Sequence, residues 1–387
     1  MGVKMMRALR LLALLIAISA FANRPVCADT VTLLRTPNAG IQPQAVLDAK
    51  GTMHLIYFKG DERAGNIFYV RRAPGATDFS RPIRVNSEPN TAMSVGTVRV
   101  ANIALGPDGR AMVGWNGLGP KGPNGYPEAY PAFARLSDSG TEFEPQRNVS
   151  HWARGLDGGG SLAADGAGRV YMVWHALAGA RDETGRAVYV AISADGGKTF
   201  SREKMANPEP LGACGCCALR AFVTQSGALA VLYRSADRKV NRDTMLLVSS
   251  DYGATFREQK LDSWKIDSCP MSTYAMAQAP GGALTAAWET EGHVFAARLP
   301  GAGYTPTGRI ACVGESQKHP SIGVGAGGSL LAAWAEGTGW NRGGSLVWQM
   351  YDAAGRPTAV RGRTGDLPVW GLPSVVADAG GKFIIVY

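Results

Sequence analysis

Charged residues and histidines are scarce in this sequence of 387 residues, since 18% are Asp, Glu, Lys or Arg and five are His. No cluster of Lys and Arg, and no basic stripe interleaved with aromatic residues, occurs along the chain. This absence argues against a nucleic-acid partner. The formal charge is +9, but four basic residues precede position 29, so the remainder carries about +5. These four residues are Lys4, Arg7, Arg10 and Arg24.

Long hydrophobic runs are also rare, and the one that stands out lies near the beginning. It extends from Leu11 to Phe21 and follows three basic residues. Because it is too short to cross a bilayer, it predicts a secretory signal peptide over residues 1–28 rather than an anchor. We therefore expect residues 29–387 to form one domain, periplasmic or secreted, without a membrane span and monomeric.

Two cleavage sites fit the preference for small residues. Cleavage after Ala28 is preferred to cleavage after Ala22 because it leaves a polar spacer behind the apolar run. Lipid attachment at Cys27 is the alternative, although Pro25 and Val26 lack the small residue that usually precedes such a site.

Helical periodicity is almost absent beyond the leader. The chain has 50 Gly and 22 Pro, and these residues separate short strand-like runs, which predicts an all-β protein. A Gly followed six residues later by Trp or Tyr recurs seven times, each time at an expected hairpin. The pairs are Gly51/Tyr57, Gly109/Trp115, Gly168/Trp174, Gly227/Tyr233, Gly282/Trp288, Gly328/Trp334 and Gly381/Tyr387.

Most of these hairpins are followed by two further strand-like runs. Four strands per unit of about 46–59 residues is the size of one blade of a β-propeller. Seven hairpins predict seven blades, and six blades with an extra hairpin is the alternative. The last unit has only two strands, so we expect Thr30–Leu34 to add an outer strand to it and leave no open edge.

Two segments between third and fourth strands carry the same short motif. It resembles the Asp box of sialidases and related propellers, which implies a structural role on the face opposite the binding site. The matching residues are Ser193, Asp195, Gly197, Thr199 and Phe200, and Ser249, Asp251, Gly253, Thr255 and Phe256.

In such propellers, the loops leading into the first strands and the loops between second and third strands open onto one face, here called the channel face. Cys214, Cys216 and Cys217 precede the expected first strand of blade four, and Cys269 precedes that of blade five. We expect the four cysteines to meet there, with Met271 and His319 nearby.

Three interpretations of this cysteine group remain open. In an oxidising compartment, cysteines usually form disulfides, and a disulfide that fixes the loop is the first interpretation. Thiolates, a thioether and an imidazole also suit Cu(I) or Zn(II), so a metal or redox site is the second. Unpaired thiols are the third. Segment 212–290 resembles bacterial sialidase-like proteins of unassigned activity with a similar cysteine-rich turn followed by Cys-Pro.

The resemblance to sialidases also raises the possibility of glycoside hydrolysis. Sialidases bind a carboxylate with three arginines and use a Tyr-Glu pair, and they carry Phe/Tyr-Arg-Ile-Pro near the start. The most similar segment of this sequence, Ser80–Arg84, does not match the Phe/Tyr-Arg-Ile-Pro motif. We therefore favour a binding or metal-handling propeller over an exo-α-sialidase, and convergence of three arginines opposite a Tyr-Glu pair would favour the enzyme.

Several further side chains are expected on the channel face, where a glycan or small ligand could bind. Each of them is also compatible with a structural role at a strand end or a solvated rim. They are His175, Arg234, Arg242, Asp243, Glu289 and Trp340, with Arg99 and Tyr274 as weaker candidates.

Overall fold

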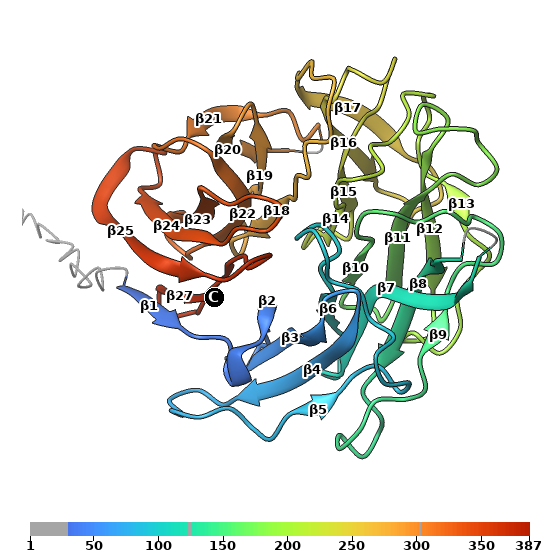
Figure 1. Cartoon of the computed structure of the whole chain (residues 1–387). Helices are drawn as coiled ribbons and strands as arrows, with labels where there is room; N and C mark the ends of the chain where they lie inside the picture. Colours follow the sequence, from blue (N-terminus) through green and yellow to red (C-terminus); the bar gives the residue numbers. More distant parts are fainter. Residues whose placement is uncertain (1–29, 123–124, 302) are drawn as a thin grey trace, which may run out of the picture.

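The computed structural model describes residues 30–122, 125–301 and 303–387. The predicted signal peptide, residues 1–28, lies outside these residues. Seven β-sheets surround a central axis like the blades of a propeller (Figure 1). The prediction of an all-β propeller with seven blades is confirmed, and the six-blade alternative is wrong. No helix in the described part of the chain is long and apolar enough to cross a membrane.

Six blades each contain four antiparallel strands in chain order, from the axis outward. Blades one to three are β2 (Ile41–Leu47), β3 (Met53–Asp61), β4 (Ala64–Arg72) and β5 (Ile83–Arg84); β6 (Asn102–Leu105), β7 (Ala111–Lys121), β8 (Pro127–Arg135) and β9 (Arg147–Asn148); and β10 (Ser161–Ala164), β11 (Val170–Ala176), β12 (Ala187–Ser193) and β13 (Lys204–Met205). Blades four to six are β14 (Arg220–Val223), β15 (Leu229–Arg234), β16 (Thr244–Ser249) and β17 (Arg257–Asp262); β18 (Ala275–Gln278), β19 (Leu284–Thr290), β20 (His293–Leu299) and β21 (Thr307–Ala311); and β22 (Gln317–Val324), β23 (Leu330–Glu336), β24 (Gly344–Tyr351) and β25 (Pro357–Leu367).

The seventh blade joins the two ends of the described chain. β26 (Ser374–Ala377) pairs antiparallel with β27 (Lys382–Val386), and β1 (Thr30–Leu34) pairs parallel with β27 on its other side. Beyond β1, the Thr36 amide donates to the Tyr387 carbonyl at 2.7 Å, and a short 3₁₀ helix, η1 (Pro37–Ala39), leads into blade one. The predicted outer strand at Thr30–Leu34 is therefore confirmed.

The repeated glycine and aromatic residue have separate physical roles. Six of the seven repeat glycines have positive φ, and in blade five the neighbouring Gly281 takes this conformation in place of Gly282, as the tight turn between first and second strands requires. The aromatic side chains pack between neighbouring sheets: Trp115 of β7, for example, shares a core cluster with Ile56 and Tyr69 of blade one. Burial of these clusters on both faces of each sheet holds the blades together.

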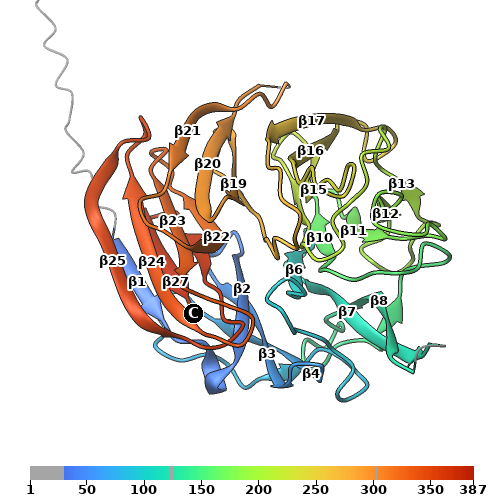
Figure 2. The ribbon, with the colours of Figure 1, turned by 45° about the horizontal axis from the view of Figure 1, so that its top comes forward.

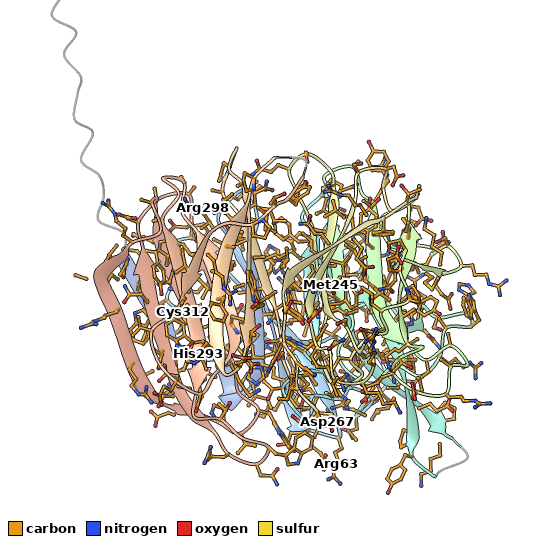
Figure 3. The ribbon with its side chains drawn as sticks, turned by 90° about the horizontal axis from the view of Figure 1, so that it is seen from above. Arg63, Met245, Asp267, His293, Arg298 and Cys312 are labelled. Atoms are coloured by element: carbon orange, nitrogen blue, oxygen red, sulfur yellow. The ribbon has the colours of Figure 1, made fainter. Side chains whose placement is uncertain are left out.

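The two faces of the ring carry different loops. Arg63, between β3 and β4, and Asp267, in the loop leading to β18, lie toward one side of the ring, whereas Arg298, near the end of β20, lies toward the other (Figure 3). The tilted ribbon in Figure 2 shows the first strands of the blades gathered around the axis. The loop between β3 and β4 and the loop leading to β18, both expected on the channel face, therefore lie toward the same side of the ring.

Both predicted Asp boxes form closed turns on the opposite face. In the first, the Asp195 carboxylate accepts the Thr199 amide at 2.9 Å and the Thr199 hydroxyl at 2.7 Å, and the Ser193 hydroxyl accepts the Gly197 amide at 2.8 Å. Phe200 then packs edge-on against Phe133 of the preceding blade. Ser249, Asp251, Gly253 and Thr255 repeat the same bonds.

We predict that Asp195→Ala lowers the free energy of unfolding by about 1–2 kcal/mol, because the amide and hydroxyl of Thr199 lose their acceptor. Although burial opposes ionisation, the bonds from Thr199 and Ser193 lower the pKa of Asp195 to about 2. The contribution is thus complete above about pH 4 and lost as the pH falls toward 2. Urea unfolding at pH 7 and pH 2.5 measures both effects. Asp267→Ala, at an exposed aspartate, is the control, and an equal loss of stability there would contradict the prediction.

Candidate functional site

Three cysteine sulfurs form a compact group in the loop between β13 and β14. The Sγ atoms of Cys214, Cys216 and Cys217 all lie within 4.8 Å of one another. The Sγ atom of Cys214 is 3.4 Å from that of Cys216 and 3.1 Å from that of Cys217. These distances exceed the roughly 2.05 Å of a disulfide bond, and the five cysteines among the described residues are free. The loop therefore holds three free thiols close together, with Cys214 and Cys217 buried and Cys216 partly exposed.

Backbone bonds from three blades fix the shape of this loop. The Cys214 amide donates to the Arg234 carbonyl of blade four at 2.8 Å, and the Cys217 carbonyl lies 3.0 Å from Nε2 of His175 in blade three. The Ala218 amide donates to the Ser272 carbonyl, just before blade five, at 3.0 Å. At Gly215, a Cβ atom would lie 3.3 Å from Arg186 Nη2. The glycine thus lets a guanidinium lie close to the loop.

Three arginines surround the sulfur group. Arg186, Arg234 and Arg242 are 7%, 1% and 4% exposed, and each lies within electrostatic range of Cys214. Arg234 donates to the carbonyls of Arg242 and Glu289, both at 2.6 Å. The Nε atom of each arginine is buried without a hydrogen-bond partner, as is Nη1 of Arg242. The surroundings of the sulfurs are therefore rich in cationic donors.

The thiols and the arginines influence one another's ionisation. Burial opposes ionisation of Cys217, but hydrogen bonds from Cys214 and Cys216, together with the charge of Arg234, hold the pKa of Cys217 well below its usual range. The hydrogen bonds that Cys216 makes to its two neighbours raise its own pKa. The group thus favours one thiolate, at Cys217, that accepts from neighbouring thiols.

Blade five supplies a second polar layer beside the arginines. Glu289 is 1% exposed; its carboxylate accepts the Ser272 hydroxyl at 2.8 Å and pairs with Lys318 Nζ at 3.2 Å. Tyr274 lies nearby, with the guanidinium carbon of Arg234 5.7 Å from its ring centroid. Burial raises the pKa of both Glu289 and Tyr274, although the charges of Lys318 and Arg234 oppose this.

The other sulfur and imidazole candidates line a separate small pocket. Cys269, Met271 and His319 contribute to a cavity of about 170 Å³ with Trp340 and Trp370, whose ring centroids are 6.0 Å apart. Cys269 is exposed and does not join the three sulfurs that lie within 4.8 Å of one another. His319 is buried, and burial lowers its pKa to about 3, which keeps the ring neutral.

Of the remaining candidates, His175 lies beside the thiol loop, whereas Arg99 and Asp243 form ion pairs of their own. His175 is fully enclosed, and burial and the charge of Arg186 lower its pKa to about 4. Arg99 pairs with Asp157, and Asp243 pairs with Lys260 at 3.2 Å. Neither Arg186 nor Lys318 was among the sequence candidates. Arg186 precedes the third strand of its blade, a position that could have been searched, and Lys318 adjoins the predicted His319.

No protein-family model matches the sequence, and a search of curated proteins finds no significant match. Solved structures do match. A protein of unknown function from Dyadobacter fermentans aligns over 85% of this chain and 96% of its own, with 14% identity and a TM-score of 0.54.

Two fungal enzymes also match. For the α-L-arabinanase of Penicillium chrysogenum, the alignment covers 81% of this chain and 93% of that chain, with 15% identity and a TM-score of 0.52. For the α-L-arabinofuranosidase Arb93A of Fusarium graminearum, the alignment covers 77% of this chain and 88% of that chain, with 10% identity and a TM-score of 0.52. At these identities the likeness shows the fold alone, which agrees with the seven-bladed propeller of this chain.

The free thiols predict a simple labelling pattern. In the native protein, iodoacetamide should modify Cys269 first, because Cys214, Cys217 and Cys312 are buried. After unfolding without reductant, all five described cysteines should react, as counted by mass spectrometry. A pair that resists alkylation until reductant is added would show a disulfide and contradict the prediction.

Proposed function

We propose that this protein is an exported, metal-handling propeller that binds one Cu(I) ion through Cys214, Cys216 and Cys217. The observation that carries this proposal is the group of three thiols within 4.8 Å of one another, enclosed by arginines with unpaired N–H groups. Sulfur ligands favour soft metals such as Cu(I). The exported location rests on the predicted signal peptide and belongs to the same proposal.

The charge around the sulfurs supports a thiolate-bound ion. Three thiolates and one Cu(I) ion carry a net charge of −2, which a buried site must compensate. Arg186 and Arg234 supply that compensation, whereas Arg242 already pairs with Glu183. The free N–H groups of all three arginines can donate to anionic sulfur. Without ionised sulfur, these buried donors remain unsatisfied at a cost of about 1–3 kcal/mol each.

The donor set favours Cu(I) over Zn(II). Structural zinc sites use four ligands, whereas the compact group contains three sulfurs. The imidazole of His175 directs Nε2 at the Cys217 carbonyl, 3.0 Å away, and not at a sulfur atom. We expect Zn(II) to bind at least about 100-fold more weakly than Cu(I), in line with the preference of soft thiolates.

Anaerobic titration against a colorimetric Cu(I) chelator tests the proposal. The reduced protein should take up one Cu(I) per chain, and Cys217→Ser should lower the affinity at least about 100-fold, because one of three ligands is lost. Cys312→Ser is the matched control, since Cys312 is buried between blades five and six. Cys269→Ser shows whether the fourth cysteine contributes.

Two outcomes would overturn the copper proposal. One is wild-type protein that binds less than one Cu(I) per chain while all three thiols are free by alkylation. The other is an equal loss of affinity in the Cys312 control. Circular dichroism of each variant distinguishes loss of a ligand from loss of the fold, which we expect to survive because a propeller core does not depend on one loop.

Glycoside hydrolysis of the sialidase type is the second candidate, supported by the proximity of Arg234, Tyr274 and Glu289. Three arginines do gather on the channel face, but they surround sulfur atoms. Tyr274 and Glu289 are 5% and 1% exposed, which leaves little access for a sugar.

We predict no turnover of a fluorogenic sialoside or α-L-arabinofuranoside by the purified protein. The measurement is fluorophore release over a range of pH, with a known hydrolase as the positive control. Turnover that Tyr274→Phe abolishes would replace the copper proposal with the enzymatic one.

A further inference from the structure

A second positively charged site lies on the propeller axis, next to the thiol loop. The first strands of the blades enclose a cavity of about 340 Å³, lined by residues of β2, β6, β14, β18, β22 and β26 among others. Arg220, at the start of β14, is the one Asp, Glu, Lys or Arg among the residues that line it. His319 also contributes, but its ring is neutral because burial lowers its pKa to about 3.

Arg220 makes hydrogen bonds to neutral groups alone. Its Nη1 atom donates to Oε1 of Gln44 at 3.2 Å and to Oδ1 of Asn102 at 3.0 Å. Its Nε atom is buried and has no hydrogen-bond partner. No acid of the described chain forms an ion pair with it. Arg220 is partly exposed, to the cavity that it lines. Desolvation lowers its pKa to about 10, so the guanidinium remains charged at neutral pH.

A cation in this position is costly unless a counter-charge accompanies it. Transfer of a charged group from water into a protein interior is strongly unfavourable when it is unpaired. Amide oxygens such as those of Gln44 and Asn102 provide partial compensation, but they leave the net charge of the cavity at +1. No acidic side chain among the residues that line the cavity supplies the counter-charge.

Hydroxyl groups on the same cavity wall can complete its coordination. The Ser321 Oγ atom accepts the Val375 amide at 2.9 Å, and the Ser374 Oγ atom accepts the Ala45 amide at 3.0 Å. Each serine uses its oxygen as an acceptor and retains its O–H as a donor. Both serines line the cavity with Arg220.

We infer that the axial cavity binds one small oxyanion, held by Arg220 and by hydroxyl groups of the inner strands. The cavity volume is near the lower end of the range for small-molecule sites, which is roughly 300–1,000 Å³. Guanidinium groups bind carboxylate and phosphate oxygens in paired geometry. The shared chemistry is that of an oxyanion, supplied either by inorganic phosphate or by the carboxylate of a small acid.

Calorimetric titration in an anion-poor buffer tests this site directly. Inorganic phosphate and acetate are the two probes, and at least one of them should bind saturably at one site per chain. It should also raise the Tm by at least about 2 °C at 100 times Kd, since ligands that bind the native state stabilise it. Preference for phosphate identifies an inorganic anion, whereas preference for acetate identifies a carboxylate.

Two substitutions separate the anion site from a structural role of the arginine. Arg220→Met should lower the affinity at least about 30-fold, and Arg220→Lys should retain part of it because the charge remains. Arg356→Met, at an arginine whose side chain is 78% exposed, is the matched control. Should Arg220→Met fail to fold, the comparison of Arg220→Lys with the wild type still measures the guanidinium contribution.

Failure of this inference is distinguishable from failure of the copper proposal. Cys217→Ser should leave anion binding unchanged, because Cys217 does not line the cavity. The inference is overturned if wild-type protein binds neither probe at one site, or if Arg220→Met and the wild type show equal affinity and an equal rise in Tm.

Discussion

Pairing of β1 with β27 constrains everything else in this molecule, because a propeller can position its loops only when the ring is closed. The two strands come from opposite ends of the described chain and align in parallel from Thr30 beside Lys382 to Leu34 beside Val386. Their sheet then packs against blade one through a cluster that contains Tyr57 and Val386. Closure removes the exposed edge that an open sheet would present, and it holds the seven sets of loops in register around one axis.

The fixed arrangement of neighbouring blades also determines the position of the thiol loop. Its backbone is bonded to groups of blades three, four and five, so the three sulfurs are held by a structure much larger than the loop itself. The arginines likewise come from two blades: Arg186 precedes β12, whereas Arg234 ends β15 and Arg242 follows it. Cationic donors fixed in advance need not reorganise when negative charge develops on sulfur, which is the physical basis of preorganised electrostatic stabilisation.

Local patterns in the sequence predicted the blades well because each blade repeats the same turn and the same aromatic contact. The pair Gly51 and Tyr57 alone already predicts a hairpin and its packing. The turn requires a positive φ, which favours glycine, and the space between neighbouring sheets requires a large aromatic side chain. The thiol site was predicted in part: Cys214, Cys216 and Cys217 are contiguous, and their loop position follows from the repeat. The position of Arg186 before the third strand of its blade could have indicated a candidate. The place of Cys269 outside the thiol group was not predictable, because side-chain direction across neighbouring blades depends on twist and packing that no local pattern encodes. Arg220 lies within a strand and gives no sequence signal of a site.

The axial site follows from how a propeller satisfies its innermost strands. Each first strand has a free edge toward the axis, and its unpaired amides need acceptors that no further strand can supply. Serines of neighbouring blades fill that need: Ser161 Oγ accepts the Ala221 amide at 2.9 Å, as Ser321 and Ser374 accept those of Val375 and Ala45. The Ser161 hydroxyl donates in turn to Asn102 Oδ1 at 3.2 Å, whereas Ser321 and Ser374 line the cavity and retain their O–H groups as donors. Arg220 adds a full positive charge to these O–H donors. A small anion would accept their hydrogen bonds and also balance the charge.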